Sequence, residues 1–236
     1  EKFNKNLGCI IYCVGSDDWK TKKKKGFFSN FYHLKKIIFK NDFKSFIFLS
    51  STRLYINSSS KTSENDFIST RSEDENDYYN ILKLMSETIL LNLHKNIKIL
   101  RISNIIGFNY NSPLLLPTLI RDSIKKSKIT ITINHNSTKD YILIDDLISL
   151  LFKIEKKSKY KIYNIASGVN FKIKDIALII KKETGCKIIL KNQKKLVREP
   201  KININRIKKE FSFKSKIEIK KIIPKLIDKY KKLSSF

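Results

Sequence analysis

The sequence predicts an α/β protein with a doubly wound parallel sheet, followed by a smaller α+β part. Three runs, at 7–14, 46–50 and 97–102, are apolar with little alternation of polar and apolar side chains. Such runs are typical of parallel strands buried on both faces. Helical patterns lie between them, and the order strand–helix–strand–helix–strand predicts parallel strands joined by crossover helices. At 236 residues, 41% hydrophobic, the chain can bury a core in one or two domains.

Two helices are predicted between these strands. Apolar residues recur at helical spacing in 27–40, and a second helical pattern covers 76–95. The second helix follows a polar, serine-rich segment at 57–77 that ends in three acidic residues at 73–75. Acidic residues suit the positive N-terminal end of a helix, so they support a helix start at this point.

Beyond Pro113 the pattern changes to shorter elements. We predict helices at 115–126, 145–155, 171–183, 203–211 and 218–232, and strands at 129–133, 140–144, 161–165 and 187–190. Gly185 is expected to end the helix at 171–183. We therefore divide the chain into regions 1–112 and 113–236, and expect the strand near 161–165 to return to the main sheet.

The formal net charge of +27 raises the question of a nucleic-acid partner. A nucleic-acid groove needs lysines gathered in one stripe, ideally with stacking aromatic residues between them. Here the lysines are spread along the chain, apart from a short run at 22–25 and a basic tail at 229–232. We therefore expect solvated surface lysines and no nucleic-acid partner, although such a surface would still attract an anionic substrate.

The cysteines and the apolar runs argue against disulfides, a zinc site and a membrane span. Cys9, Cys13 and Cys186 are odd in number and lack paired short spacings. The apolar run at 9–14 is far too short to cross a bilayer. We expect a cytoplasmic protein with neither a metal site nor a membrane anchor.

The residues with the most informative chemistry are Tyr79 and Lys83, four positions apart in the second predicted helix. This spacing places both on one face. An adjacent cation favours phenolate, so it would lower the pKa of the tyrosine from its usual value of about 10. Ser51, at the end of a predicted strand, could share the proton. The trio suits proton removal from a sugar or alcohol hydroxyl. A tyrosine and a lysine at this spacing are common on helices, so the catalytic interpretation depends on the neighbouring segments.

Six segments, in order along nearly the whole chain, resemble the extended short-chain dehydrogenase/reductase family, specifically its NAD-dependent sugar-nucleotide epimerases and dehydratases. The segments are 10–15 (IIYCVG), 49–55 (LSSTRLY), 78–87 (YYNILKLMSE), 100–107 (LRISNIIG), 139–146 (KDYILIDD) and 163–168 (YNIASG). Each is weak alone, but six in sequence are not expected by chance. The fold implied is Rossmann-like, with 1–112 as a partial cofactor-binding and catalytic region and 113–236 as the substrate-binding region.

The resemblance implies a catalytic role for Ser51, Tyr79 and Lys83. Tyr79 would be the base, Lys83 would lower its pKa and bind the nicotinamide ribose, and Ser51 would hydrogen-bond the reacting hydroxyl. The implied chemistry is hydride transfer from a sugar carbon to give a keto-sugar, with return of the hydride to the other face in an epimerase. The implied cofactor, NAD or NADP, would contact Gly15, Ser50, Tyr79, Lys83 and Ser103.

The substrate implied by the resemblance is a nucleotide-diphosphate sugar, used in the synthesis of surface-polysaccharide precursors. Arg198 would clamp the diphosphate, because cations suit pyrophosphate. The family also implies a homodimer through the helices at 27–40 and 76–95. The complete set of implied substrate-binding residues is Ser51, Asn104, Lys139, Tyr141 and Arg198.

Three departures from the family pattern narrow the expected activity. Lys139 stands where the family usually has Arg, so a bidentate phosphate contact is lost. Leu114 occupies a position that is commonly Asn, which puts the uridine-type contacts in doubt. Dehydratases carry an Asp–Glu pair directly after the catalytic Thr, where this chain has Thr52 and Arg53. We therefore favour an epimerase or keto-sugar reductase over a dehydratase.

The sequence also lacks a recognisable cofactor turn. Its six glycines include no G-x-G-x-x-G pattern, the turn that receives the pyrophosphate of the cofactor. Its first predicted strand resembles the fourth of the family, so we expect a fragment of a longer enzyme or a degenerate paralogue. The run at 9–14 would then be an unpaired, aggregation-prone edge, and the chain alone would bind NAD weakly. The alternative function is a non-catalytic sugar-nucleotide-binding protein.

Overall fold

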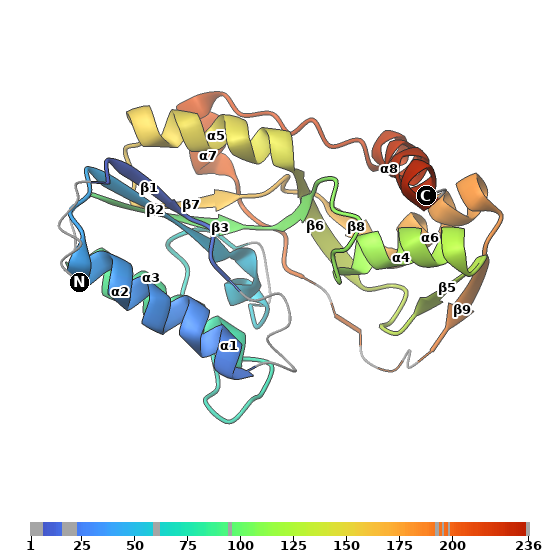
Figure 1. Ribbon diagram of the computed structural model, residues 1–236, viewed down its shortest axis with the longest axis horizontal. Coiled ribbons are helices and arrows are strands. Elements are labelled where there is room, and N and C mark those ends of the chain that lie inside the picture. Colours follow the sequence, from blue (N-terminus) through green and yellow to red (C-terminus); the bar gives the residue numbers. More distant parts are fainter. Residues whose placement is uncertain are drawn as a thin grey trace.

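The main sheet consists of four parallel strands in the order β1-β2-β3-β7 (Figure 1). The structure is a computed structural model that describes residues 7–15, 23–58, 62–93, 96–191, 194, 196–197 and 199–234. The sheet strands are β1 (Cys9–Tyr12), β2 (Ser45–Ser51), β3 (Ile97–Ile102) and β7 (Ile162–Ile165). The predicted parallel α/β architecture is confirmed, and β7 brings the C-terminal half of the chain back to this sheet.

Helices cover both faces of the main sheet (Figure 1). Successive strand residues point to opposite faces, so Phe46 and Phe48 pack with one set of helices and Ile47 with the other. The first face carries α1 (Lys23–Phe27), the π-helical segment η1 (Phe28–Tyr32), α2 (His33–Lys40) and α3 (Tyr78–Leu93), and the opposite face carries α5 (Ile144–Lys157) and α7 (Asn205–Phe211).

The predicted helix at 27–40 is interrupted by the π-helical turn η1. The Gly26 carbonyl accepts hydrogen bonds from Ser29 Oγ at 3.1 Å and Asn30 Nδ2 at 2.9 Å. The Ser29 carbonyl accepts from Tyr12 Oη at 2.6 Å. Side chains that bond to helix carbonyls compete with the regular backbone ladder, which accounts for a local departure that apolar spacing alone could not indicate.

Strand β1 forms one edge of the sheet, and it is not buried on both faces as the sequence predicted. Tyr12 is buried against the helices, whereas Cys9 and Ile11 are exposed. The reason is that the core cluster on the face of α5 and α7 includes no residue of β1, whereas Tyr12 belongs to the cluster on the other face. Within the described residues β1 pairs only with β2. The prediction of an unpaired apolar edge is confirmed for the part of the chain that the structure describes.

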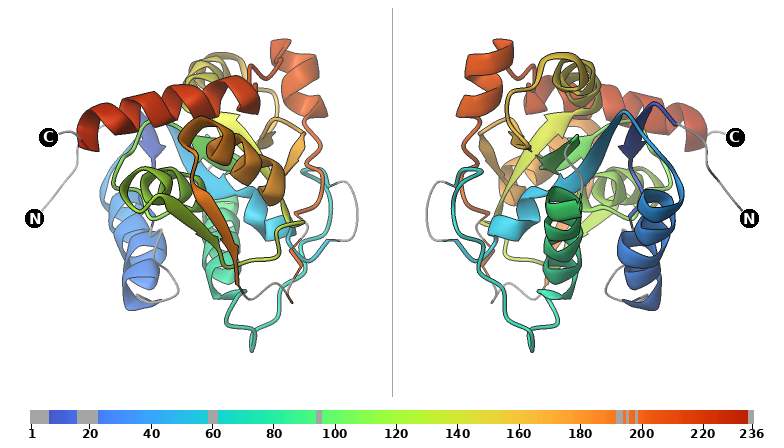
Figure 2. Two further views of the ribbon diagram at one scale, coloured as in Figure 1. Left: turned by 90° about the vertical axis from the view of Figure 1, so that its right-hand side faces the viewer. Right: turned by 90° about the vertical axis from the view of Figure 1, so that its left-hand side faces the viewer.

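The rest of the chain builds a second part with its own core (Figures 1 and 2). Its strands are β4 (Asn104–Ile106), β6 (Thr138–Leu143) and β8 (Asn170–Lys172), which form one sheet, and the parallel pair β5 (Lys128–Ile131) and β9 (Lys187–Leu190). Its helices are α4 (Leu115–Lys125), α6 (Ile173–Thr184) and α8 (Ile219–Ser234), and α8 packs against the other two. Strands β4 and β8, of three residues each, were not predicted.

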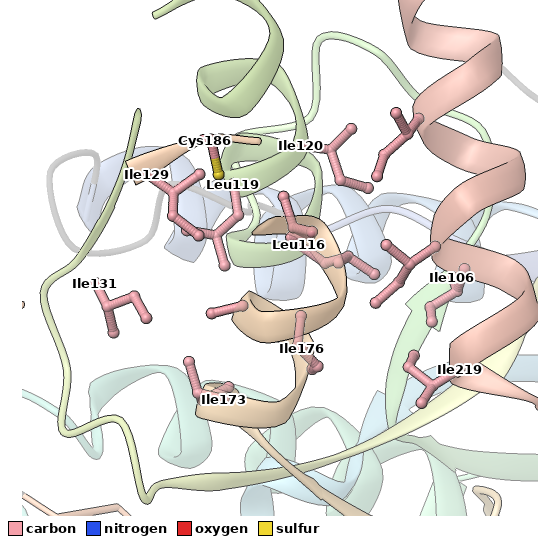
Figure 3. Packing of buried hydrophobic residues seen from close by; sticks show 14 of the residues in the cluster. Ile106, Leu116, Leu119, Ile120, Ile129, Ile131, Ile173, Ile176, Cys186 and Ile219 are labelled. Carbon is pink, nitrogen blue, oxygen red and sulfur yellow. The ribbon is translucent and has the colours of Figure 1, made fainter. Parts of the chain in front are cut away.

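Figure 3 shows how the apolar side chains of this second core pack. Leu116 and Ile120 of α4, Ile176 of α6 and Ile219 of α8 belong to one buried cluster, in which Ile219 lies beside Ile106 and Cys186 lies near Leu119 and Ile129. Burying such side chains is the main source of stability for a part of this size. None of the helices in the described ranges has both the length and the apolar character needed to cross a bilayer.

Candidate active site

A cleft of about 580 Å³ opens at the carboxyl ends of the main-sheet strands, beside the second part of the chain. Open parallel sheets bind their ligands at this edge. The described lining comes mainly from the residues that follow β1, the end of β2 and the junction of β3 with β4. It comprises Cys13, Val14, Gly15, Leu49, Ser50, Ser51, Thr52, Arg53, Tyr79, Lys83, Ile102, Ser103, Asn104, Ile105, Leu114, Lys139 and Glu199.

Three consecutive residues of β2 hold three successive turns of α3, an arrangement that we call the β2–α3 lock. Ser51 hydrogen-bonds the Tyr79 side chain. The Leu49 carbonyl accepts from Lys83 Nζ at 3.1 Å, and Ser50 Oγ donates to Glu87 Oε1 at 2.5 Å. The helical residues are four positions apart, so they share one face. The lock brings Ser51, Tyr79 and Lys83 together at the cleft.

The electrostatics of the trio differ from the sequence prediction. Desolvation raises the pKa of Tyr79, against the opposing effects of the Ser51 hydrogen bond and the Arg53 charge. The expected lowering by Lys83 is wrong for this structure, because Lys83 Nζ points to the Leu49 carbonyl and lies 6.0 Å from the Tyr79 ring centroid. Arg53 supplies the cationic support instead.

Lys83 itself is strongly affected by its surroundings. Its side chain is buried, and Nζ lies 4.7 Å from the ring centroid of Phe48. Desolvation lowers the pKa of Lys83 to about 8, although the negative charge of Glu87 favours its protonated form. At pH 7 the ammonium is therefore still mostly protonated, although its pKa is only about one unit higher than this pH. Glu87 matters to the site because its charge helps to keep Lys83 protonated.

A buried polar network, which was not predicted from the sequence, lies beneath the cleft. Arg101 Nη2 pairs with Glu87 Oε2 at 2.7 Å, and Arg101 Nη1 donates to Tyr55 Oη at 2.7 Å. Tyr55 Oη in turn donates to Asn164 Oδ1 at 2.9 Å. The available signal was Arg101, a charged residue inside an apolar strand, because a buried charge requires a partner. Glu87, one helical turn after Lys83, was the candidate partner for that charge.

Of the residues expected to contact the cofactor, Gly15 is exposed, whereas Ser50 and Ser103 are buried. Gly15 and Ser103 line the cleft. A Cβ atom at position 15 would lie 3.9 Å from Lys83 Nζ, so a glycine here leaves the space beside the ammonium open. Ser50 also contributes to the lining, but its side chain is buried and its hydroxyl is directed to Glu87.

The residues expected at the substrate end are only partly brought together. Asn104 and Lys139 line the cleft, and both contact Glu199, which the sequence analysis did not single out. Tyr141 is buried in the second core, packed against Phe171, and is not part of the described lining. Arg198 lies outside the described residues. The signal for Glu199 was its position directly after the expected clamp.

The comparisons with known proteins agree with this architecture. No curated protein matches the chain. Among solved structures, UDP-glucuronic acid 4-epimerase from Bacillus cereus, as a variant in complex with a UDP-sugar analogue and NAD, is 18% identical with a TM-score of 0.83, over 96% of this chain and 76% of that one. RMD from Pseudomonas aeruginosa, complexed with NADPH, is 14% identical with a TM-score of 0.82, over 95% and 81%. dTDP-glucose 4,6-dehydratase from Bacillus anthracis, in complex with NAD, is 16% identical with a TM-score of 0.75, over 96% and 73%.

The comparison that establishes the family is made with the sequence itself. A model of the NAD dependent epimerase/dehydratase family matches residues 3–166, which contain β1, the β2–α3 lock and most of the cleft lining. This match covers more than half of the chain, whereas the solved structures establish the fold. The chain therefore belongs to the NAD dependent epimerase/dehydratase family.

Proposed function

We propose that the cleft is the catalytic site of an NAD-dependent nucleotide-sugar epimerase or a related oxidoreductase that acts through a keto-sugar. The observation that carries this proposal is the β2–α3 lock, which joins a serine hydroxyl, a phenol and a desolvated ammonium at one edge of the sheet. A module that only binds nucleotide sugars has no need for this trio.

The roles of the trio follow from its contacts. Ser51 Oγ accepts from the Arg53 backbone amide at 3.1 Å, so its own proton is available for the Tyr79 oxygen or for a substrate hydroxyl. Tyr79, supported as phenolate by Ser51 and Arg53, takes the proton of the reacting hydroxyl and returns it in the reverse step. The ammonium of Lys83 lies 6.0 Å from the Tyr79 ring centroid, on the same face of α3, where it would bind the nicotinamide ribose.

The nicotinamide end of NAD or NADP would fit the part of the cleft that Gly15, Lys83 and Ser103 line. Lys83 has ammonium protons beyond the one donated to Leu49, and Gly15 leaves the adjacent space open. Gly15, Ser103 and Lys83 would hold this end, with Ser50 acting through Glu87. When bound, the cofactor accepts a hydride from the sugar carbon and returns it. The solved relatives named above contain NAD or NADPH, which is consistent with either cofactor.

Epimerisation or keto-sugar reduction is the reaction that we favour over dehydration. Elimination of water requires an acid and a base beside the sugar. Thr52 Oγ1 instead bonds to the Ile102 carbonyl, and Arg53 Nη2 bonds to the Asn76 carbonyl. Glu199 is the only carboxylate in the lining that the structure describes, and it lies with Lys139 at the substrate end.

The wider setting is also a proposal. We place the reaction in the cytoplasm, in the synthesis of surface-polysaccharide precursors, and free Cys9, Cys13 and Cys186 are consistent with a reducing compartment. Substrate binding would involve Asn104 and Lys139, together with Tyr141 and Arg198 as the resemblance implies.

A homodimer through α2 and α3 is supported by an apolar groove between these helices. Leu34, Ile38 and Ile89 line the groove, and Phe39 at its rim is exposed. A second copy would cover this face. Sedimentation of Phe39→Asp should then show more monomer than sedimentation of the wild type, whereas Phe152→Asp, a matched change at an exposed residue of α5, should have no effect.

The decisive experiment is a panel of nucleotide sugars with NAD and with NADP, comparing Tyr79→Phe with the wild type. Loss of the phenol should lower turnover at least about a hundredfold, while calorimetry shows unchanged sugar-nucleotide affinity. Tyr78→Phe is the matched control, because Tyr78 is not part of the described cleft lining and its hydroxyl donates to the Lys23 carbonyl. Equal turnover in Tyr79→Phe would refute the catalytic role. Binding without turnover in the wild type would favour the non-catalytic alternative.

A further inference from the structure

The substrate end of the cleft contains a carboxylate of the protein itself. Glu199 Oε1 lies 2.7 Å from Lys139 Nζ, and Glu199 Oε2 accepts hydrogen bonds at 3.3 Å from Asn104 Nδ2 and from the backbone amide of Asp140. Asn104, Lys139 and Glu199 all line the cleft. The two side chains expected to meet the substrate's anionic group at this end thus already bind an anion.

The contacts of Glu199 are those that a phosphate oxygen would make. Carboxylate and phosphate oxygens both accept charge-assisted bonds from an ammonium and further bonds from amide groups. The Lys139–Glu199 pair is also partly open to water, with 24% and 20% of the two side chains exposed. Ion pairs with access to solvent contribute little to stability, so this one can separate without unfolding the protein.

We propose that Glu199 is an internal competitor for the anionic part of the substrate. A diphosphate must displace its carboxylate from Lys139 and Asn104 before it binds at this end of the cleft. The identity of the natural ligand rests on the proposed function, but the competition itself concerns any anion of this class. Glu199 then selects for ligands with strong charge, because a weakly charged group gains too little to take its place.

Inorganic pyrophosphate is the probe that tests this competition, since it requires neither a sugar nor a cofactor. Its affinity for wild type and for Glu199→Gln is measured by calorimetry. The glutamine keeps an oxygen that accepts from Asn104 and Asp140 but releases Lys139. We expect pyrophosphate to bind Glu199→Gln about fivefold more tightly or better, the factor that corresponds to the loss of one partly exposed ion pair.

Two further variants show where a gain arises. Glu210→Gln makes the same change in net charge at a glutamate that accepts from Lys159 and Tyr163 and lies outside the described cleft lining. It should bind pyrophosphate as the wild type does. Adding Lys139→Met to Glu199→Gln should abolish the gain, because the released ammonium is then absent.

The outcomes separate this inference from the proposed function. Equal or undetectable pyrophosphate binding in Glu199→Gln overturns the competition, as does an equal gain in Glu210→Gln. If pyrophosphate binds Glu199→Gln more tightly but no nucleotide sugar is turned over, the competition is supported and the proposed function is refuted. If a nucleotide sugar is turned over but pyrophosphate affinity does not rise, the proposed function is supported and the competition is refuted. If Glu199 only tethers its loop, Glu199→Gln should lower the melting temperature and leave the pyrophosphate affinity unchanged.

Discussion

Two ion pairs, one beneath the cleft and one in its lining, have the same length and opposite surroundings. Arg101 and Glu87 approach to 2.7 Å with 5% and 2% of their side chains exposed. Lys139 and Glu199 also approach to 2.7 Å, but with 24% and 20% exposed. The first pair is part of the scaffold, since neither charge can return to water without unfolding. The second faces a cleft in which water or a ligand can replace either partner. Burial, not distance, distinguishes a fixed pair from an exchangeable one.

The largest effect on stability is expected where a buried charge loses its partner. Arg101→Met removes the guanidinium that pairs with buried Glu87, while the hydrogen bond from Ser50 remains. Removing one partner of a buried pair costs about 3–5 kcal/mol. Urea unfolding measures this loss. Lys126→Met, which breaks an exposed pair with Asp122 on α4, should change the unfolding free energy by about 0.5 kcal/mol or less. Equal effects of the two variants would contradict the comparison.

The next effect concerns the pH dependence of stability. The folded state releases the Lys83 proton at a pKa of about 8, whereas an unfolded lysine holds it to about 10.4. Between these pH values the unfolded state binds more protons, so the free energy of unfolding rises with pH, by up to about 3 kcal/mol from this group. Lys83→Met should lack this rise and be more stable than the wild type at pH 7.

The measurement is urea unfolding at pH 7, 8, 9 and 10 for the wild type and Lys83→Met. Lys36→Met, at an exposed position of α2, controls for the loss of one positive charge. A stability difference between wild type and Lys83→Met that stays constant over this range would show that Lys83 is not desolvated as described.

Ser50→Ala should have an intermediate effect, because Glu87 keeps Arg101 but loses a hydroxyl donor. A hydrogen bond to a charged group contributes about 1.5–3 kcal/mol, against about 1 kcal/mol for a neutral one. Ser86 supplies the neutral comparison, since its buried hydroxyl donates to two uncharged groups, the backbone carbonyls of Asn30 and Leu82. The loss in Ser50→Ala should therefore exceed that in Ser86→Ala when both are measured by thermal and urea unfolding.

The smallest effect is expected for the exchangeable pair. Glu199→Gln should change the free energy of unfolding by about 1 kcal/mol or less, because partly exposed ion pairs contribute little. Chemical unfolding of this variant beside Arg101→Met tests the comparison directly. A loss as large as that of Arg101→Met would place Glu199 in the scaffold and would remove the basis for displacement by a ligand.

The fold was largely predictable because its elements are periodic or continuously apolar. The strand at 97–102 and the strand at 187–190 match β3 and β9, and the helix at 76–95 differs from α3 only at its ends. Strands β4 and β8 were not predictable, because three residues carry no periodic signal. The π-helical turn depends on side chains from other elements, among them Tyr12.

The candidate site was predictable only where local spacing determines geometry. Tyr79 and Lys83 share a face because a helix turns once in about 3.6 residues, and Ser51 reaches them because α3 packs on β2. The surroundings of Lys83 were not predictable, because they depend on burial against Phe48 and on the Leu49 carbonyl. The pair of Glu199 with Lys139 joins residues that lie sixty positions apart.

The β2–α3 lock has a consequence for how the connecting segment can be altered. Three contacts join α3 to β2 directly, in addition to the chain that connects them. Phe67, midway along that connection, is 99% exposed. We therefore expect new termini or a protease cut near Phe67 to leave the trio assembled. A single inserted residue within β2 would instead reverse the faces of all that follow and separate the serine from the phenol.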